Sequence, residues 1–222
     1  MLYLLDIFGT FVFAVSGAFR AVKYELDILG VLVLSVATGV GGGLIRDIII
    51  GATPPAAFQD ETYLLICVLG GLIVFISAPK IAVRWDLVML ADAVGLGVFT
   101  AIGCFKGIAH GLGPIGIIMM GAITATGGGM VRDILVTEIP AVIRTDVYAT
   151  AAIAGGGCLL LVRYLGYGEP VQLMSAIVTT TGLRFLAMGY QLSLPKVRCL
   201  PESPSSLTRQ RKTRREKVGS KQ

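Results

Sequence analysis

Long uncharged runs alternate with short charged segments along the chain. Four runs lack Asp, Glu, Lys and Arg throughout: Ile28–Ile45, Thr62–Pro79, Gly107–Val131 and Val147–Val162. Three more runs contain a single charged residue each: Leu2–Phe19, Leu87–Phe105 and Val171–Tyr190. A membrane-spanning helix needs about 20 mostly apolar residues. The pattern therefore predicts an all-α integral membrane protein with seven transmembrane helices.

Composition supports a membrane protein, and the charge distribution sets its orientation. Charged residues make up 15% of the chain, whereas a soluble domain has about 25%. Residues 1–194 hold 10 Lys or Arg and 12 Asp or Glu, but residues 195–222 hold 9 and 2. The body thus lacks a basic surface for nucleic acid. Lys and Arg concentrate in the tail and in the loops on its side, so we expect an external N-terminus and a cytoplasmic C-terminus.

The tail, residues 195–222, combines this positive charge with prolines and serines. This composition is typical of a disordered segment. A polybasic segment after a membrane helix attracts anionic lipid. The alternative is that the tail serves only as a topology signal and a solubilising end.

The chain matches itself without a gap when it is shifted by 86 residues. Asp6 then aligns with Asp92 and Phe13 with Phe99, and two eight-residue segments coincide, GGGLIRDI and GGGMVRDI. Each copy has three predicted helices, and an odd number makes the second copy start from the opposite face of the membrane. Such inverted repeats commonly build a solute or ion path at the midplane. The chain therefore divides into a first repeat (1–86), an inverted second repeat (87–170), a seventh helix (171–194) and the tail.

Each copy carries three consecutive glycines, Gly41–Gly43 and Gly127–Gly129, past the middle of an apolar run. A glycine inside a helix costs about 1 kcal/mol relative to alanine. Three together predict that the second and fifth helices kink or unwind there. Unwound backbone at membrane depth requires cover by protein or water, which favours an ion path. The alternative is that the glycines merely let two helices pack closely.

A charged pair follows each glycine triplet, Arg46-Asp47 and Arg132-Asp133. Charges this deep usually mark a water-filled path or a buried ion pair. Adjacent residues of a helix diverge by about 100°, so we expect pairing across the repeats, Arg46 with Asp133 and Arg132 with Asp47. The alternative is a pair of salt bridges near the interfaces that fix the topology.

Five of the other polar residues inside the apolar runs are candidates for a role in the path or in helix packing. Asp6 and Asp92 are expected to cap helix starts, with cation sites or arginine partners as alternatives. Thr38 and Thr124 lie one turn before the triplets, where their hydroxyls either line a path or bond back to their own helices. Arg184 is expected either to snorkel or to pair with a buried carboxylate.

No motif for catalysis or metal binding accompanies these residues. His110 is the only histidine, and the four cysteines do not form a cluster with it, so a structural zinc site lacks its ligands. Neither a phosphate-binding loop nor a nucleophile elbow is present. We therefore expect no enzyme, no cofactor and no resident metal.

Two GGG-x-x-RD-I segments in a three-plus-three-plus-one helix pattern closely resemble the prokaryotic TRIC family, the trimeric intracellular cation channels. The resemblance covers about residues 2–192. It implies a homotrimer in the cell membrane in which each subunit has a pore between its second and fifth membrane helices. It also implies a pore that conducts monovalent cations, chiefly potassium, and lipid seated between subunits.

Residue chemistry and resemblance together define the candidate ion pathway. Its expected members are Thr38, Gly41, Gly42, Gly43, Arg46, Asp47, Thr124, Gly127, Gly128, Gly129, Arg132 and Asp133, with Asp6 and Asp92 as caps or supports. A competing class is a secondary transporter of a small zwitterion such as glycine, because inverted repeats with broken helices serve carriers equally well.

Overall fold

The structure is a computed structural model that describes residues 1–81, 85–144 and 147–190. Within these ranges all regular secondary structure is helical. The helices are α1 (Leu2–Lys23), α2 (Ile28–Ile49), α3 (Ala56–Gln59), α4 (Thr62–Ile81), α5 (Trp85–Ala109), α6 (Pro114–Leu135), α7 (Ala141–Arg144), α8 (Ala149–Tyr164) and α9 (Glu169–Tyr190). The tail predicted for residues 195–222 lies outside the described residues.

Each of the seven apolar runs forms a helix, which confirms the all-α prediction. Among the described residues, five helices are long and apolar enough to cross a membrane: α1, α2, α6, α9 and the Met89–Ala109 part of α5. The apolar part Thr62–Ser77 of α4 and the helix α8 are shorter. The 16 residues of α8 extend only about 24 Å at 1.5 Å per residue, less than the roughly 30 Å hydrocarbon core. Seven complete spans therefore stay a prediction.

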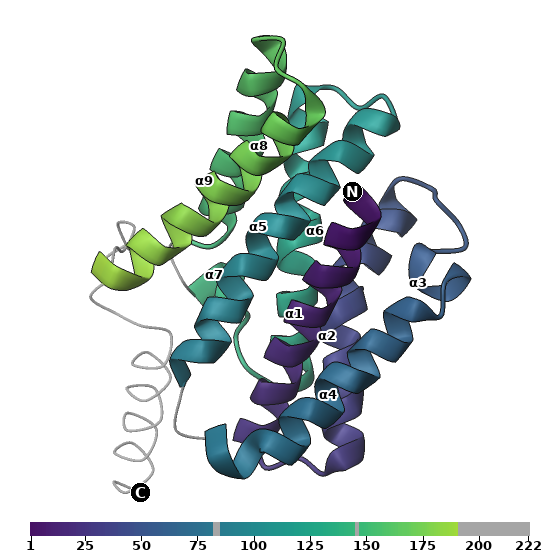
Figure 1. Cartoon of the computed structure of the whole chain (residues 1–222), viewed down its shortest axis with the longest axis vertical. Helices are drawn as coiled ribbons and strands as arrows, with labels where there is room; N and C mark the ends of the chain where they lie inside the picture. Colours follow the sequence, from purple (N-terminus) through teal and green to yellow (C-terminus); the bar gives the residue numbers. More distant parts are fainter. Residues whose placement is uncertain (82–84, 145–146, 191–222) are drawn as a thin grey trace, which may run out of the picture.

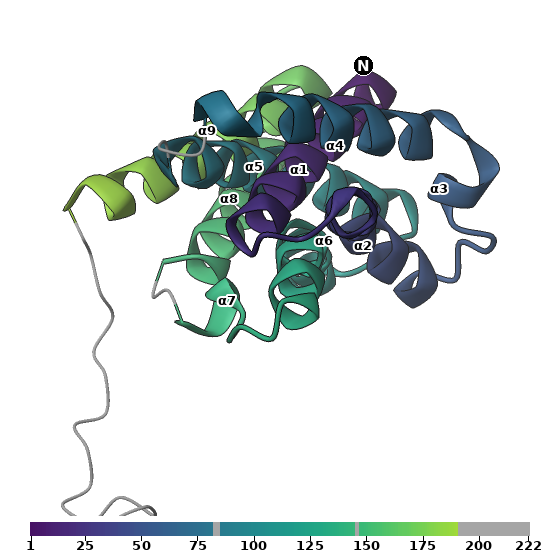
Figure 2. The same ribbon diagram turned by 90° about the horizontal axis from the view of Figure 1, so that it is seen from below.

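Two short helices, α3 and α7, were not predicted. Each follows one of the Arg-Asp pairs by fewer than ten residues. Figure 1 places them at different edges of the bundle, and the view in Figure 2 agrees. Sequence periodicity did not reveal them because a four-residue helix is too short to show an apolar repeat.

The internal duplication extends to the conformation of the turns. Glu25 and Gly111 have φ of 54° and 69°, and Gly51 and Thr137 have φ of 72° and 58°. Both pairs are separated by the same 86 residues as the sequence repeat. The long helices α1 and α5 lie side by side and run in opposite directions in Figure 1. Matched sequence positions thus adopt matched left-handed turns at opposite ends of the bundle.

Helices α2 and α6 cross in direct backbone contact at their glycine triplets. A Cβ added to Gly42 would overlap the carbonyl oxygen of Thr124, and one added to Gly128 would overlap that of Thr38. Both helices nevertheless continue through the triplets without a break. The predicted unwinding is therefore wrong, and the contact agrees with the close packing of the alternative. The kink and the ion path stay predictions. Omitting three Cβ atoms brings the backbones together while each helix keeps its own hydrogen bonds.

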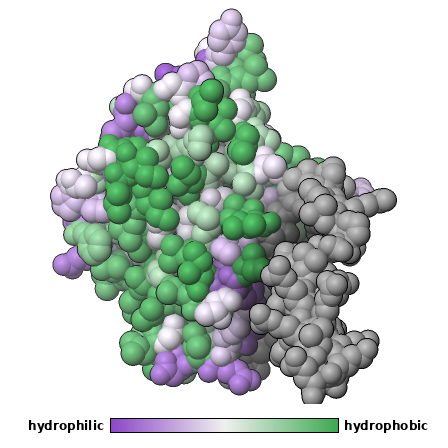
Figure 3. Space-filling view, turned by 180° about the vertical axis from the view of Figure 1, so that it is seen from behind, coloured by the Kyte–Doolittle hydropathy of each residue, from purple (hydrophilic) through white to green (hydrophobic). Residues whose placement is uncertain are grey.

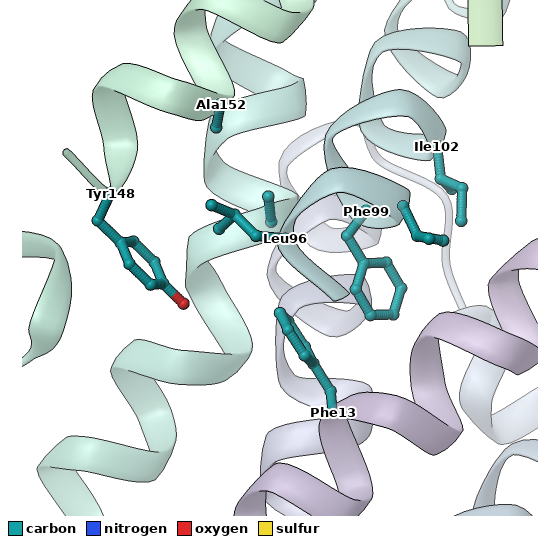
Figure 4. Packing of buried hydrophobic residues seen from close by; sticks show 8 residues of the cluster. Phe13, Leu96, Phe99, Ile102, Tyr148 and Ala152 are labelled. Carbon is teal, nitrogen blue, oxygen red and sulfur yellow. The ribbon is translucent and has the colours of Figure 1, made fainter. Parts of the chain in front are cut away.

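A core shared by both repeats packs beside this crossing (Figure 4). Phe13 and Phe99, which are matched positions of the repeat, have ring centroids 5.0 Å apart. Leu96, Ile102, Tyr148 and Ala152 are the other labelled members of the cluster, and all are almost fully buried. The two halves are thus joined by one apolar core.

Helix α9 has no counterpart in the first repeat and packs against α5 and α8. Added Cβ atoms at Gly97 and Gly155 would overlap the hydroxyls of Thr181 and Thr180 on α9. The matched positions in the first repeat are Phe11 and Leu69. Where α9 packs, the second repeat therefore has glycines at two positions at which the first repeat has large side chains.

The exterior of the bundle is apolar. Large side chains such as Val33, Leu65, Met119, Ile153 and Val178 are more than 45% exposed. Apolar side chains cover much of the face shown in Figure 3. A soluble monomer rarely exposes so much contiguous apolar surface, so this surface fits contact with lipid or with other membrane helices.

The α2–α6 contact predicts that Gly42→Ala lowers the thermal stability of the protein in detergent. The added methyl meets the Thr124 carbonyl, which belongs to a helix backbone and cannot rotate away. Overpacking of this kind costs about 1–3 kcal/mol. Gly157→Ala on α8 is the matched control, because its Cβ would meet no atom within 4 Å. Size-exclusion profiles after a heating series measure the midpoints, and equal midpoints would contradict the crossing.

The packing of α9 predicts that Gly155→Leu, which restores the first-repeat residue, displaces α9. The new side chain overlaps Thr180 and the carbonyl of Ala176. Ala176 is fully buried, so Ala176→Cys, in a background without the native cysteines, should gain reactivity toward a thiol reagent. Gly157→Leu serves as the control. Unchanged protection of Cys at this position in the Gly155→Leu variant would argue against the contact.

Candidate functional site

Two clusters of buried charged residues lie beyond the glycine crossing, one for each Arg-Asp pair. In the second-repeat cluster, Arg132 donates from Nε to Oδ1 of Asp133 at 3.0 Å. Its Nη1 donates to Oδ1 of Asp92 at 2.8 Å and to Oγ of Ser16 at 2.7 Å. Arg132 is 4% exposed. One guanidinium thus connects α6 to α5 and to α1 of the other repeat.

Arg20 on α1 joins the same cluster. Its Nη2 lies 3.0 Å from Oδ1 of Asp133 and 3.2 Å from Oε2 of Glu138. The hydroxyl of Tyr24 donates to Glu138, and this bond holds the pKa of the partly exposed Glu138 carboxyl below its usual value. Buried charges are tolerated when they are paired in this way, and each charged group of the second-repeat cluster has an oppositely charged partner.

The first-repeat cluster has the same residue types and fewer bonds. Arg46, 1% exposed, donates from Nε to Oδ1 of Asp47 at 2.8 Å, and its buried Nη1 has no partner among the described residues. The backbone N–H of Ala56 donates to Oδ2 of Asp47 at 3.0 Å. Asp6 accepts a 3.1 Å hydrogen bond from the hydroxyl of Tyr63. No cation lies within ion-pair distance of Asp6 in the described part of the chain.

A small cavity separates these groups. Asp6, Thr10, Arg46, Asp47 and Tyr63 line it, and it has room for about one water molecule. The cavity is therefore lined by the Asp6 carboxylate, which no cation reaches at ion-pair distance, and by Arg46, whose Nη1 has no acceptor among the described residues.

The predicted pairing across the repeats, Arg46 with Asp133 and Arg132 with Asp47, is wrong. The contacts between the glycine triplets show that α2 and α6 cross antiparallel. Arg46 and Arg132 each lie four residues past the crossing, about 6 Å along their own helices, and therefore on opposite sides of it. Each arginine instead folds its long side chain back so that Nε reaches the adjacent aspartate.

The predicted capping role of Asp6 and Asp92 is also wrong. The N-cap of α1 is Met1, and Asp92 lies well inside α5. The alternative of an arginine partner holds for Asp92, which binds Arg132, whereas Asp6 binds Tyr63. Their role as cation sites stays a prediction.

Thr38 and Thr124 bond back to their own helices. Their hydroxyls donate to the carbonyls of Leu34 and Met120, each at 2.6 Å. Both threonines are fully buried, and a path along them is not open in this structure.

Arg184 follows neither predicted alternative. It is 7% exposed, so it does not snorkel, and it has no carboxylate partner among the described residues. Its Nη1 donates to the carbonyl of Val147 at 3.0 Å, and its guanidinium stacks 4.7 Å from the ring centroid of Tyr148. Arg184 thus anchors α9 to the start of α8.

Several site residues gave no signal in the sequence pattern. Ser16 aligns with Ile102 and Thr10 with Leu96, so the repeat hid them. Arg20 directly follows the first apolar run, and in the sequence its positive charge indicates only the orientation of the protein in the membrane. A comparison of the polar residues that differ between matched positions would have found Ser16 and Thr10.

The described residues provide no set of ligands for a bound metal ion. The described residues contain no group of three or more His, Cys, Asp or Glu side chains that could hold an ion. His110 is exposed, and its Nδ1 contacts the carbonyl of Lys106.

Comparisons with known proteins extend over most of the chain. A family model described as "Glycine transporter" matches residues 3–79 and 89–164. A UPF0126 membrane protein of Vibrio cholerae is 42% identical over 88% of this chain and 82% of its own length. The UPF0126 inner membrane protein YadS of Escherichia coli K12 is 41% identical over 88% and 95%.

Solved structures of similar sequence share the fold. The TRIC trimeric intracellular cation channel orthologue from Rhodobacter sphaeroides has a TM-score of 0.82 at 34% identity, over 86% of this chain and 98% of its own. A second structure, described as the basis for conductance through TRIC cation channels, has a TM-score of 0.82 at 35% identity, over 90% and 98%. The chain therefore belongs to the TRIC family, which its duplicated glycine and Arg-Asp motifs had indicated.

Proposed function

We propose that this protein is a potassium-permeable cation channel of the cell membrane. Likeness to solved TRIC cation channels over nearly their whole length carries the proposal. The buried charges add a physical argument, because ionisable side chains at membrane depth usually mark an ion path. The inner membrane relatives support the location.

The proposed pore runs within each subunit between α2 and α6, past both charge clusters. The glycine triplets bring the two helices into contact in this conformation, so conduction requires them to separate. Helices that meet at glycines have few interlocking side chains to separate. The inverted relation of the repeats then gives the pore one charge cluster near each end.

The assembly and orientation are part of the same proposal. The related channels are described as trimeric, and we infer a homotrimer with lipid between subunits. The N-terminus is external and the basic tail cytoplasmic, where it attracts anionic lipid.

One observation favours a second candidate, a carrier of a small zwitterion such as glycine. Asp6 lacks a cation and Arg46 Nη1 lacks an acceptor in the same cavity. An amino acid would satisfy both, since its ammonium group matches the carboxylate and its carboxylate matches the guanidinium. The family model carries the description "Glycine transporter". The cavity must widen to admit such a ligand.

Flux measurements in proteoliposomes separate the two candidates. We expect a potassium gradient to drive rapid flux with unitary current steps, and labelled glycine to show no saturable uptake, because a channel offers a continuous wet path. Saturable glycine uptake without unitary currents would establish the carrier instead.

Two variants test whether the glycine crossing lies on the path. Gly42→Leu should abolish potassium flux, since a bulky side chain at the crossing fills the space that the separated helices must open. Gly157→Leu, on the open side of α8, should retain it. Equal flux in both variants would place the pore elsewhere.

A further inference from the structure

The two aspartates of the Arg-Asp pairs receive nearly the same hydrogen bonds. Oδ1 of Asp133 accepts from Nε of Arg132, and Oδ2 accepts from the N–H of Ala141 at 2.8 Å. Oδ1 of Asp47 accepts from Nε of Arg46, and Oδ2 from the N–H of Ala56. Both carboxylates are therefore held in the same orientation at the end of their helix.

A third donor distinguishes them. Arg20 reaches Oδ1 of Asp133 from α1, so an ion pair crosses between the two repeats. Among the described residues, no side chain of the second repeat makes the matching contact with Asp47. The acceptor position that Arg20 occupies on Oδ1 of Asp133 is therefore open on Oδ1 of Asp47.

Lys106 on α5 stands at the position that matches Arg20 in the repeat. Its side chain is half-buried and has no ion-pair partner in the described part of the chain. By the 86-residue repeat, Lys106 is related to the first-repeat cluster as Arg20 is related to the second-repeat cluster. Because α1 and α5 run in opposite directions (Figure 1), Arg20 and Lys106 lie at opposite ends of the bundle.

We propose that Lys106 pairs with Asp47 and so forms a second ion pair between the repeats. We call each of these ion pairs, Arg20–Asp133 and Lys106–Asp47, a latch. In this structure the Arg20–Asp133 latch is closed and the Lys106–Asp47 latch is open. Closing the second latch brings α5 toward the end of α2 and removes the small cavity beside Asp6. The role of the Lys106–Asp47 pair as a gate rests on the proposed channel function. The existence of the ion pair does not depend on that function.

The exchange of arginine for lysine makes the two latches unequal. Arg20 contacts two carboxylates at once through a planar guanidinium, whereas an ammonium group on a flexible stem acts as a point charge. The Lys106 latch is therefore the one that opens and closes more readily, and the Arg20 latch is the more permanent closure.

Amine labelling tests the ion pair without reference to transport. Full-length protein in liposomes is treated with an amine-reactive ester, and modification of Lys106 is measured by mass spectrometry relative to Lys23 in the same molecule. An ammonium paired with Asp47 reacts slowly, so Asp47→Asn should raise labelling of Lys106 by about threefold or more. Asp60→Asn, which removes a partly exposed carboxylate from the segment between α3 and α4, should leave it unchanged. Equal labelling in all three proteins would overturn the pairing.

Potassium flux tests the latch as a gate, with Asp47 left intact. Lys106→Gln removes the latch and should increase flux, whereas Lys106→Arg strengthens it and should reduce flux; Arg163→Gln controls for the loss of an exposed positive charge. Flux that is the same in Lys106→Gln and Lys106→Arg would refute the gate. A labelling change in a protein without any flux would instead uphold the ion pair and reject the channel.

Discussion

Contact between the backbones of α2 and α6 determines where the two Arg-Asp pairs of the site lie. The helices touch at Gly42 and Gly128 because no side chain separates them. Since the helices cross antiparallel, the Arg-Asp pair that follows each triplet is carried away from its counterpart. One close approach therefore creates two separate charge clusters.

The clusters illustrate how a membrane protein stabilises buried charge. The second-repeat cluster pairs Arg132 and Arg20 with three carboxylates, so each charge has a close opposite. The first-repeat cluster keeps the residue types but leaves Asp6 and one nitrogen of Arg46 unpaired beside a cavity. Leaving such groups unpaired is costly in an apolar medium, which makes this end of the bundle the one poised to bind or to rearrange.

The sequence was sufficient for the helical fold and for the duplicated motifs, because apolar run length and an 86-residue register are properties of the chain itself. It was not sufficient for the partners of the charged residues. The 100° divergence of adjacent helix residues favours Asp133 over Asp47 as the partner of Arg46. The arginine side chain is nevertheless long enough to return to the next residue. The role of Ser16 depends on α1 and α6 lying together, which no local pattern encodes. The glycine triplets do mark the contact between α2 and α6. The low helix propensity of glycine favours unwinding, whereas the tertiary contact keeps both helices continuous.

Helix α9 also bears on how the chain is assembled. In the first repeat α4 packs directly on α1, with Phe11 beside Gly70. In the second repeat α8 shares more of its surface with α9 than with α5. A chain that enters the membrane from its N-terminus therefore inserts every helix of its first repeat early, although α1 and α2 still lack their contacts with α5 and α6. Its second repeat also requires α9, the last of the described helices, so α8 reaches its final packing only after α9 has been inserted.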